Sequence, residues 1–115
     1  MDAVTAVSGS GPAYFFLLAE AMVDAGVEQG LPRDVALTLA TGTALGAGAM
    51  LTGGGDGPGQ LRYNVSSPGG TTAAAIRRLE AGGLRAAVAD AVEAAASRSR
   101  EMAAAAVEDD DDNRH

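Results

Sequence analysis

Apolar residues dominate the first half of the chain and follow a helical period. Between positions 12 and 30 almost every residue is apolar, and the acids Glu20, Asp24 and Glu28 recur every four residues. On a helix, that spacing places the three carboxylates in one narrow stripe. The pattern predicts a helix over residues 12–30 whose remaining surface is covered by protein, part of it from a second chain.

A second apolar stretch predicts a helix over residues 33–52. No residue from 35 to 51 is charged, so a membrane span is the competing interpretation. The stretch is short for a span and only weakly apolar, because it is rich in Ala, Gly and Thr. Gly42 and Gly46 lie four residues apart and would let another helix approach closely, although each costs about 1 kcal/mol of helix propensity. We therefore favour a buried helix–helix interface in a soluble protein.

The second half of the chain predicts three more helices. Segments rich in Gly, Pro and Ser separate them, and the helices are expected over about residues 59–65, 71–81 and 84–106. The acidic run that follows predicts a disordered, solvated tail over residues 108–115. No stretch alternates apolar and polar residues as a strand would. The fold class expected is all-α, a bundle of about five helices over residues 1–107.

Composition indicates that this bundle does not stand alone. Only 2 Tyr, 2 Phe and no Trp occur in 115 residues, and much of the apolar content is Ala. A core of Ala, Gly and Val buries little area per residue, so a monomer of this size would be marginally stable. Association with a second chain is therefore expected.

Charge and residue types exclude several classes of function. The 15 acids outnumber 8 basic residues, all of them Arg, which argues against non-specific nucleic-acid binding. Cysteine is absent and the only His is the terminal His115, so no metal site is expected. The start, Met1 and Asp2, lacks the basic residues of a signal peptide, which favours the cytoplasm. The Lys-free, acidic composition fits a salt-rich cell interior and high-GC codon bias equally well.

One segment contains residue types that packing alone does not require. Gly69 and Gly70 would let a ligand approach the backbone, and they precede Thr71 and Thr72 at a predicted helix start. Free N–H groups and the helix dipole favour a phosphate or carboxylate there, and hydroxyls of Ser67 and the threonines add donors. Ordinary loop and cap chemistry explains the same residues, so both interpretations stay open on the pattern alone.

The remaining candidates for chemistry are weaker. The run from Ser8 to Gly11 is faintly similar to a phosphate loop but lacks the strand and Lys of one, so a turn and helix cap is preferred. Arg77 and Arg78 are interpreted as solvated, and a carboxylate could meet Arg62. No His is present to act as a base within the fold. The residues alone predict binding of a small carboxylate and no further chemistry.

Several motifs, however, resemble those of one enzyme family. Residues 61–72, LRYNVSSPGGTT, are similar to the signature of pyrroline-5-carboxylate reductases, and residues 8–14, SGSGPAY, resemble the start of that family's C-terminal domain. Three shorter motifs also fit in order: DAGV at 24–27, GLPR at 30–33 and GGLR at 82–85. The resemblance covers about residues 3–102.

The resemblance implies a fold and a reaction. The fold is an all-α domain, like the C-terminal domain of 6-phosphogluconate dehydrogenase, whose helices interleave with a second subunit in a homodimer, often assembled further into a ring. The reaction passes hydride from NAD(P)H to the C=N carbon of 1-pyrroline-5-carboxylate and gives L-proline. This sequence contains no counterpart of the family's N-terminal Rossmann domain. Tight cofactor binding and reduction by this chain alone are therefore not expected, and an inactive dimerisation scaffold is the alternative.

The resemblance also implies roles for particular residues. The substrate would contact six residues: Val65, Ser67, Gly69, Gly70, Thr71 and Thr72. Its carboxylate would be held by backbone N–H groups and hydroxyls of the loop from Ser67 to Thr72. Thr72 would also hydrogen-bond the ring nitrogen, which makes it the expected catalytic residue. Ser10 and Gly11 match the turn beside the nicotinamide. No general base is required, because the imine nitrogen can be protonated before or during hydride transfer. Positioning of the substrate against the nicotinamide supplies most of the catalysis.

Overall fold

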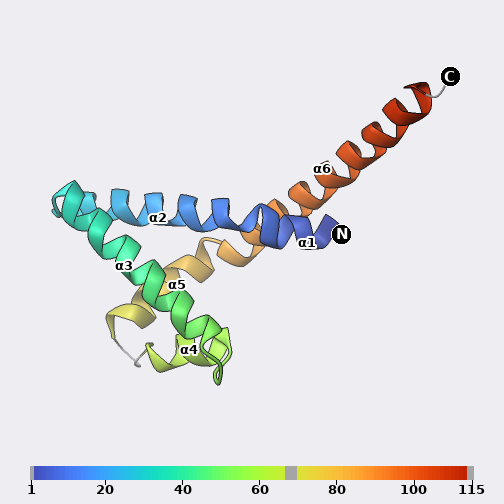
Figure 1. The fold of residues 1–115 in the computed structure, drawn as a ribbon. Coiled ribbons are helices and arrows are strands. Elements are labelled where there is room, and N and C mark those ends of the chain that lie inside the picture. The colour runs from blue at the N-terminus through green and yellow to red at the C-terminus, as the bar shows by residue number, and fades with distance from the viewer. Residues whose placement is uncertain (1, 67–69, 114–115) are drawn as a thin grey trace. The chain divides into compact units, whose positions relative to one another are not determined.

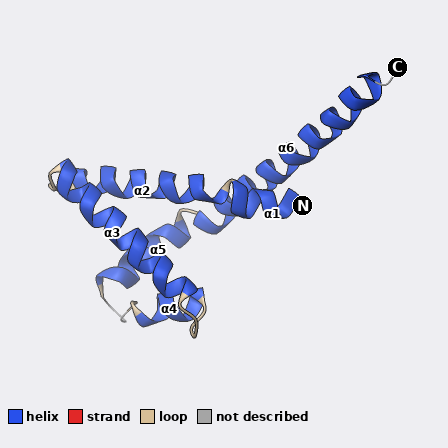
Figure 2. Cartoon of the chain, viewed as in Figure 1, coloured by secondary structure: helices blue, strands red, loops and turns tan. Residues whose placement is uncertain are grey.

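The computed structural model describes residues 2–66 and 70–113, and this part of the chain is helical without a strand (Figures 1 and 2). The elements in chain order are α1 (Asp2–Val4), the π-helix η1 (Thr5–Gly9), α2 (Gly11–Glu28), α3 (Arg33–Thr52), α4 (Pro58–Asn64), α5 (Thr71–Ala81) and α6 (Leu84–Asn113). The all-α fold class is confirmed, with α2 to α6 as the five expected helices. The bounds of α3 and α5 agree with those predicted.

The last helix differs from the prediction. α6 continues to Asn113, past the end expected near Ala106, so the acidic run lies in helical backbone up to that residue. This corrects the tail predicted to begin at position 108. The physical reason is local: no Gly or Pro follows Leu84, and positions 103–106 are four consecutive alanines, the strongest helix formers.

The chain before α2 is also helical, although its sequence predicted a turn and a cap. The Ser10 N–H donates to the Thr5 carbonyl at 2.9 Å, the i to i+5 bond of a π-helix. The Tyr14 hydroxyl donates to the Ala6 carbonyl at 2.7 Å and ties the start of α2 back to η1. Ser10 is left as a bend between two helices, and Gly11 is the first residue of α2.

The chain divides into two compact units, each described here by itself. The terminal unit comprises residues 1–14 with 83–115, and the central unit comprises residues 15–82. In the terminal unit α1 and η1 pack against α6. Ala6 is fully buried, and the Ser99 hydroxyl donates to the Asp2 carboxylate at 2.9 Å.

In the central unit, α2 and α3 form a hairpin around a sharp turn. Gly30 has a φ of 105°, which favours glycine, and the Leu31 N–H donates to the Gly26 carbonyl at 3.1 Å to close the end of α2. A Cβ on Gly26 would lie 3.3 Å from the Ala36 Cβ, so the two helices are in close contact at this point. The small core of the unit lies there and consists of Val23, Ala36 and Ala40, with Val27 packed against them.

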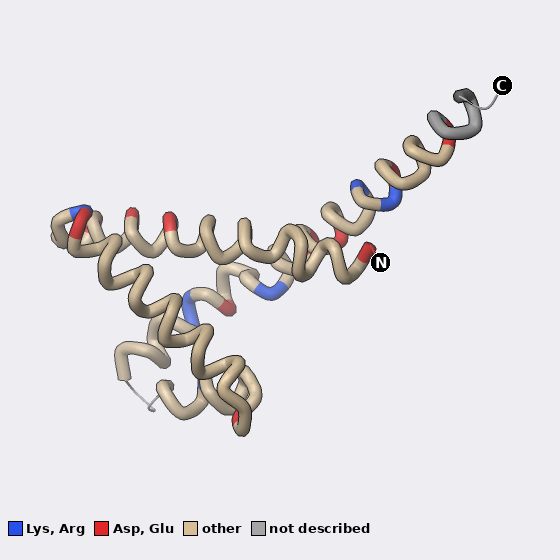
Figure 3. Tube along the Cα trace, in the orientation of Figure 1, with Lys and Arg blue, Asp and Glu red and all other residues tan. Residues whose placement is uncertain are grey.

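Beyond this turn, α2 and α3 leave most of their apolar side chains uncovered. Phe16 is 68% exposed and Leu45 77% exposed, while the only buried apolar residues in the described chain are Ala6, Val23, Ala36 and Ala40. Figure 3 shows both helices as largely uncharged along their length. A core of this size would leave a lone monomer marginally stable.

Two helical stretches, 2–28 and 33–52, are long and apolar enough to cross a bilayer by length and composition alone. This is weak evidence, since a helix that a second subunit covers passes the same test. Gly42 and Gly46 predicted the close approach of another helix. A Cβ added at either position would meet no atom within 4 Å. Their proposed partner helix therefore does not come from the described part of this chain and stays a prediction.

Candidate functional site

Two helices of the central unit, α4 and α5, bracket the segment in which carboxylate binding was predicted. α4 begins with Pro58, whose missing N–H would be unpaired at that position. At its other end, the Asn64 amide donates to the Asp56 carboxylate at 3.3 Å and accepts a hydrogen bond from the Gln60 amide at 2.8 Å. These bonds tie the end of α4 to the loop before it and so fix where the candidate segment begins.

Residues 65 and 66 wrap around the end of α4. The Val65 N–H donates to the Leu61 carbonyl at 3.3 Å, and the Ser66 N–H donates to the Tyr63 carbonyl at 3.1 Å. The Ser66 hydroxyl donates to the Arg62 carbonyl at 2.6 Å. The last carbonyls of α4 are therefore satisfied, and the Val65 side chain remains 60% exposed.

The start of α5 has no side-chain cap within the described residues. Gly70 precedes the helix in an extended conformation, with φ −84° and ψ 176°, and its carbonyl accepts the Ala74 N–H at 3.2 Å. The N–H groups of Thr71, Thr72 and Ala73 have no acceptor inside the helix. Together with the helix dipole, they form the type of helix start that binds a carboxylate or phosphate.

The backbone angles define what Gly70 contributes. Its φ is negative, so any L residue can adopt this conformation, and the glycine is not required by local geometry. A side chain at this position would instead matter if a ligand approached the backbone from that side. Substitution of Gly70 therefore tests ligand approach without a backbone penalty.

Four of the six expected substrate residues lie at these two helix ends: Val65, Gly70, Thr71 and Thr72. Ser67 and Gly69 lie outside the described residues. Thr71 is exposed and Thr72 is partly buried, and neither hydroxyl has a hydrogen-bond partner within residues 2–66 and 70–113.

The two expected cofactor residues belong to the terminal unit. Ser10 lines a pocket of about 300 Å³, together with residues that the sequence had not singled out: Thr5, Ala95, Arg98, Ser99 and Met102. Gly11 is itself buried, although an added Cβ would meet no atom within 4 Å outside its own helix backbone. Sequence reasoning missed the α6 side of this pocket because its residues are more than 80 positions away along the chain.

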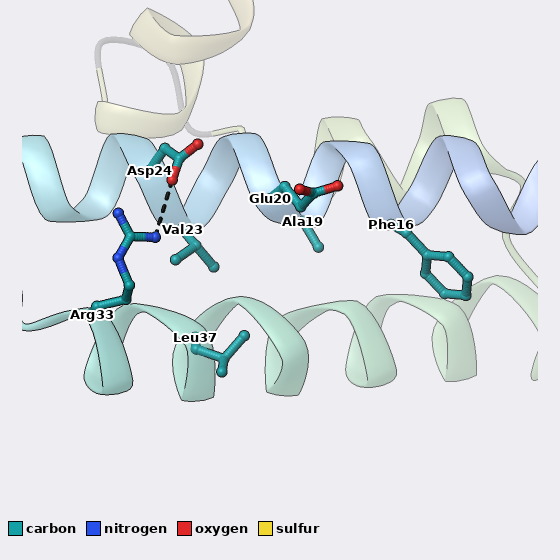
Figure 4. Close-up of a pocket in the computed structure, with 7 residues that line it drawn as sticks. All are labelled: Phe16, Ala19, Glu20, Val23, Asp24, Arg33 and Leu37. Carbon is teal, nitrogen blue, oxygen red and sulfur yellow. Dashed lines mark hydrogen bonds and ion pairs between the residues drawn. The ribbon is translucent and has the colours of Figure 1, made fainter.

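Two large apolar grooves lie between α2 and α3: the larger, about 490 Å³, is lined by Phe15, Leu18 and Leu51 among others. The other is drawn in Figure 4. It measures about 380 Å³, and Phe16, Val23 and Leu37 line it beside an ion pair in which Arg33 contacts Asp24 at 3.1 Å. Both partners of this pair are more than 60% exposed, so it stabilises the hairpin little. Groups of three or more acidic or His side chains able to hold a metal ion do not occur in the described chain.

Comparison with known proteins identifies the family. Residues 1–102 match the family described as pyrroline-5-carboxylate reductase dimerisation. The chain is 57% identical over 101 residues to a pyrroline-5-carboxylate reductase of Pisum sativum, a match that covers 88% of this chain and 37% of that protein. It is 56% identical over 119 residues to the reductase of Mycobacterium tuberculosis, covering 89% of this chain and 40% of the relative.

Solved structures agree. A pyrroline-5-carboxylate reductase of Coxiella burnetii superposes with a TM-score of 0.85 at 44% identity, over 88% of this chain and 37% of that one. A Plasmodium falciparum pyrroline carboxylate reductase, solved with NADP bound, superposes with a TM-score of 0.84 at 41% identity, over 89% and 40% of the two chains. This chain thus spans about 40% of the length of its relatives. It belongs to the pyrroline-5-carboxylate reductase dimerisation family.

Proposed function

We propose that this chain is the substrate-binding and dimerising part of a pyrroline-5-carboxylate reductase, the enzyme that forms L-proline. The observation that carries the proposal is the uncapped start of α5 behind Gly70, in a segment whose sequence matches the family signature. The reaction would reduce the C=N bond of 1-pyrroline-5-carboxylate with hydride from NAD(P)H.

The substrate carboxylate would lie at the first turn of α5. Backbone N–H groups of Thr71 and Thr72 would donate to it, while Ser67 and Thr71 would add hydroxyls. Gly69 and Gly70 would keep the approach free of side chains. Val65 would form an apolar wall at the end of α4, where its side chain is exposed. Donors that are already fixed favour binding, because the protein loses little conformational entropy when the ligand arrives.

Thr72 is proposed as the catalytic residue. Its hydroxyl would hydrogen-bond the ring nitrogen and hold the imine in a fixed orientation as its proton is gained. Precise positioning of this kind generally lowers the activation barrier by several kcal/mol. The reactants have already lost their translational and rotational entropy on binding, so it does not add to the barrier of the chemical step. No general base is needed in this scheme.

The nicotinamide would be held beside Ser10 and Gly11. Ser10 lines a pocket of the terminal unit, which supports this placement. When bound, NAD(P)H supplies the hydride, and the dinucleotide itself would be held on a Rossmann domain. The residues of this chain would orient the ring and exclude water from it.

The partner is proposed to be a second copy of the chain, with dimers assembled further into a ring in the cytoplasm. The exposed apolar faces of α2 and α3 support this proposal, because an interleaved subunit would bury them. The same faces would also serve a catalytically inactive dimerisation scaffold. The two functions differ in one property, which is whether α5 binds the substrate or product.

Calorimetric titration with L-proline distinguishes them. Wild-type chain is expected to bind, and Gly70→Val and Thr72→Ala are expected to abolish binding with the dimer intact. Thr38→Ala is the matched control, since its hydroxyl bonds only to the Asp34 carbonyl of its own helix at 3.0 Å. Binding that survives Gly70→Val would show that the carboxylate assignment is wrong.

A further inference from the structure

Two arginines of this acid-rich chain share a pocket that no carboxylate lines. Arg33 and Arg98 each pair with a carboxylate at 3.1 Å, and Arg85 also has a partner. Arg62 and Arg77, like Arg78 and Arg100, form no ion pair with any residue in the described ranges. What sets Arg62 and Arg77 apart is that they line the same pocket, in a chain whose net charge is −7.

The pocket lies between α4 and α5 within the central unit and measures about 220 Å³. Its six lining residues are Arg62, Tyr63, Ser66, Ala73, Ile76 and Arg77. Since a water molecule occupies about 30 Å³ in the liquid, this volume admits a phosphate group or a small dicarboxylate with a few waters. An apolar floor of Ala73 and Ile76 leaves the polar contacts to the arginines and the Tyr63 hydroxyl.

Several features favour an anion with two charges. Each guanidinium presents paired N–H donors that match the oxygens of one carboxylate or phosphate. Ala73 is the third residue of α5, so its unpaired N–H and the helix dipole add partial positive charge at the pocket. The Ser66 hydroxyl is already used, because it donates to the Arg62 carbonyl and holds that part of α4.

We propose that this pocket binds a small dianion, either a phosphate group or a dicarboxylate, through Arg62 and Arg77. Its lining includes none of the six residues assigned to the substrate, and it adjoins the proposed proline site at the first turn of α5, where Ala73 lies. The two arginines come from different helices, and a dianion offers a separate negative charge to each of them. The site therefore selects a dianion over L-proline.

The test is an NMR titration of the whole chain with inorganic phosphate, then with glutarate, at constant ionic strength set by chloride. Saturable shifts are expected at the Arg62 and Arg77 side-chain Nε–H signals and at the Ala73 amide. Arg62→Gln and Arg77→Gln should each weaken binding about tenfold or more, the usual scale of a lost charge-assisted hydrogen bond. Saturation by phosphate alone would identify a phosphate group, and saturation by glutarate alone would identify a dicarboxylate.

Arg78→Gln is the matched control, since it removes the same charge from the next residue of α5, which does not line the pocket. Its affinity should stay within about twofold of wild type, because charge alone is screened in solution. An equal loss in Arg78→Gln and Arg77→Gln would overturn the proposal, as would linear shifts without saturation. Circular dichroism of each variant confirms that α-helix content is retained, and L-proline affinity reports separately on the substrate site.

Discussion

The terminal unit and the α2–α3 hairpin are built from similar Ala- and Gly-rich helices but satisfy their contacts differently. In the terminal unit, α1 and η1 pack on α6 with Ala6 fully buried, and two side-chain bonds, from Tyr14 and Ser99, close the arrangement. The hairpin makes its own contacts only near the turn at Gly30. Beyond that turn its large side chains lie exposed.

The difference indicates where the proposed second chain would bind. Burial of a large apolar side chain contributes about 1.5–3 kcal/mol, and the exposed positions on α2 and α3 obtain only part of this within one chain. The largest of these side chains are Phe15, Phe16, Leu17, Leu18, Met22, Leu37, Leu39, Leu45, Met50 and Leu51. The chain belongs to a dimerisation family, and a second subunit would bury such side chains.

The largest effect is expected for a charge on the hairpin. Leu45→Asp should be harmless in an isolated chain, because Leu45 is 77% exposed, but should abolish assembly if a partner covers it. An unpaired buried carboxylate costs several kcal/mol. Light scattering and thermal unfolding measure the result. Val107→Asp on α6 is the control at a similarly exposed position, and a Leu45→Asp dimer of unchanged stability would refute the covered hairpin.

An intermediate effect is expected at Gly46. An added Cβ meets no atom within 4 Å, so Gly46→Ala should stabilise a lone chain by about 1 kcal/mol through helix propensity. If a partner helix packs against Gly46, the methyl group should instead cost about 1–3 kcal/mol through overpacking. We expect the second outcome, measured by chemical denaturation at two protein concentrations. Stabilisation at both concentrations would place the partner elsewhere.

The smallest effect is expected in the terminal unit. Tyr14→Phe removes the 2.7 Å bond to the Ala6 carbonyl and should cost about 1 kcal/mol without changing the oligomeric state. Hydrogen exchange of the η1 amides is the direct measurement, and faster exchange confined to residues 5–10 is expected. Loss of the dimer in this variant would contradict the separation between a self-contained unit and a partner-dependent hairpin.

Local signals account for what the sequence predicted of the fold. Pro32 and the pair Gly82 and Gly83 punctuate the chain, which is why the start of α3 and the end of α5 were correct. η1 was missed, because its Ser- and Gly-rich sequence is typical of a loop and its π geometry depends on packing against α6. Both η1 and the neighbouring α1 pack against α6, and the bond between Asp2 of α1 and Ser99 joins residues 97 positions apart.

In the candidate site, too, features with a local sequence signal were predicted and features that depend on contacts between helices were missed. The start of α5 was predicted correctly from two glycines followed by two threonines, because helix capping is local. The role of Val65 and the contact of Thr72 with the ring nitrogen came from the resemblance alone, whereas ligand approach at Gly70 and the threonine hydroxyl donors also followed from the local pattern. All of these roles stay proposals. The arginine pocket was missed, since Arg77 was interpreted as solvated and only the structure brings it beside Arg62.

The central claim is that the start of α5 holds the substrate carboxylate, and NMR mapping of L-proline binding on the wild-type chain in high salt tests it most directly. The account predicts saturable amide shifts confined to Gly70, Thr71, Thr72 and the residues next to them. A folded dimer in which L-proline moves none of these amides would contradict it.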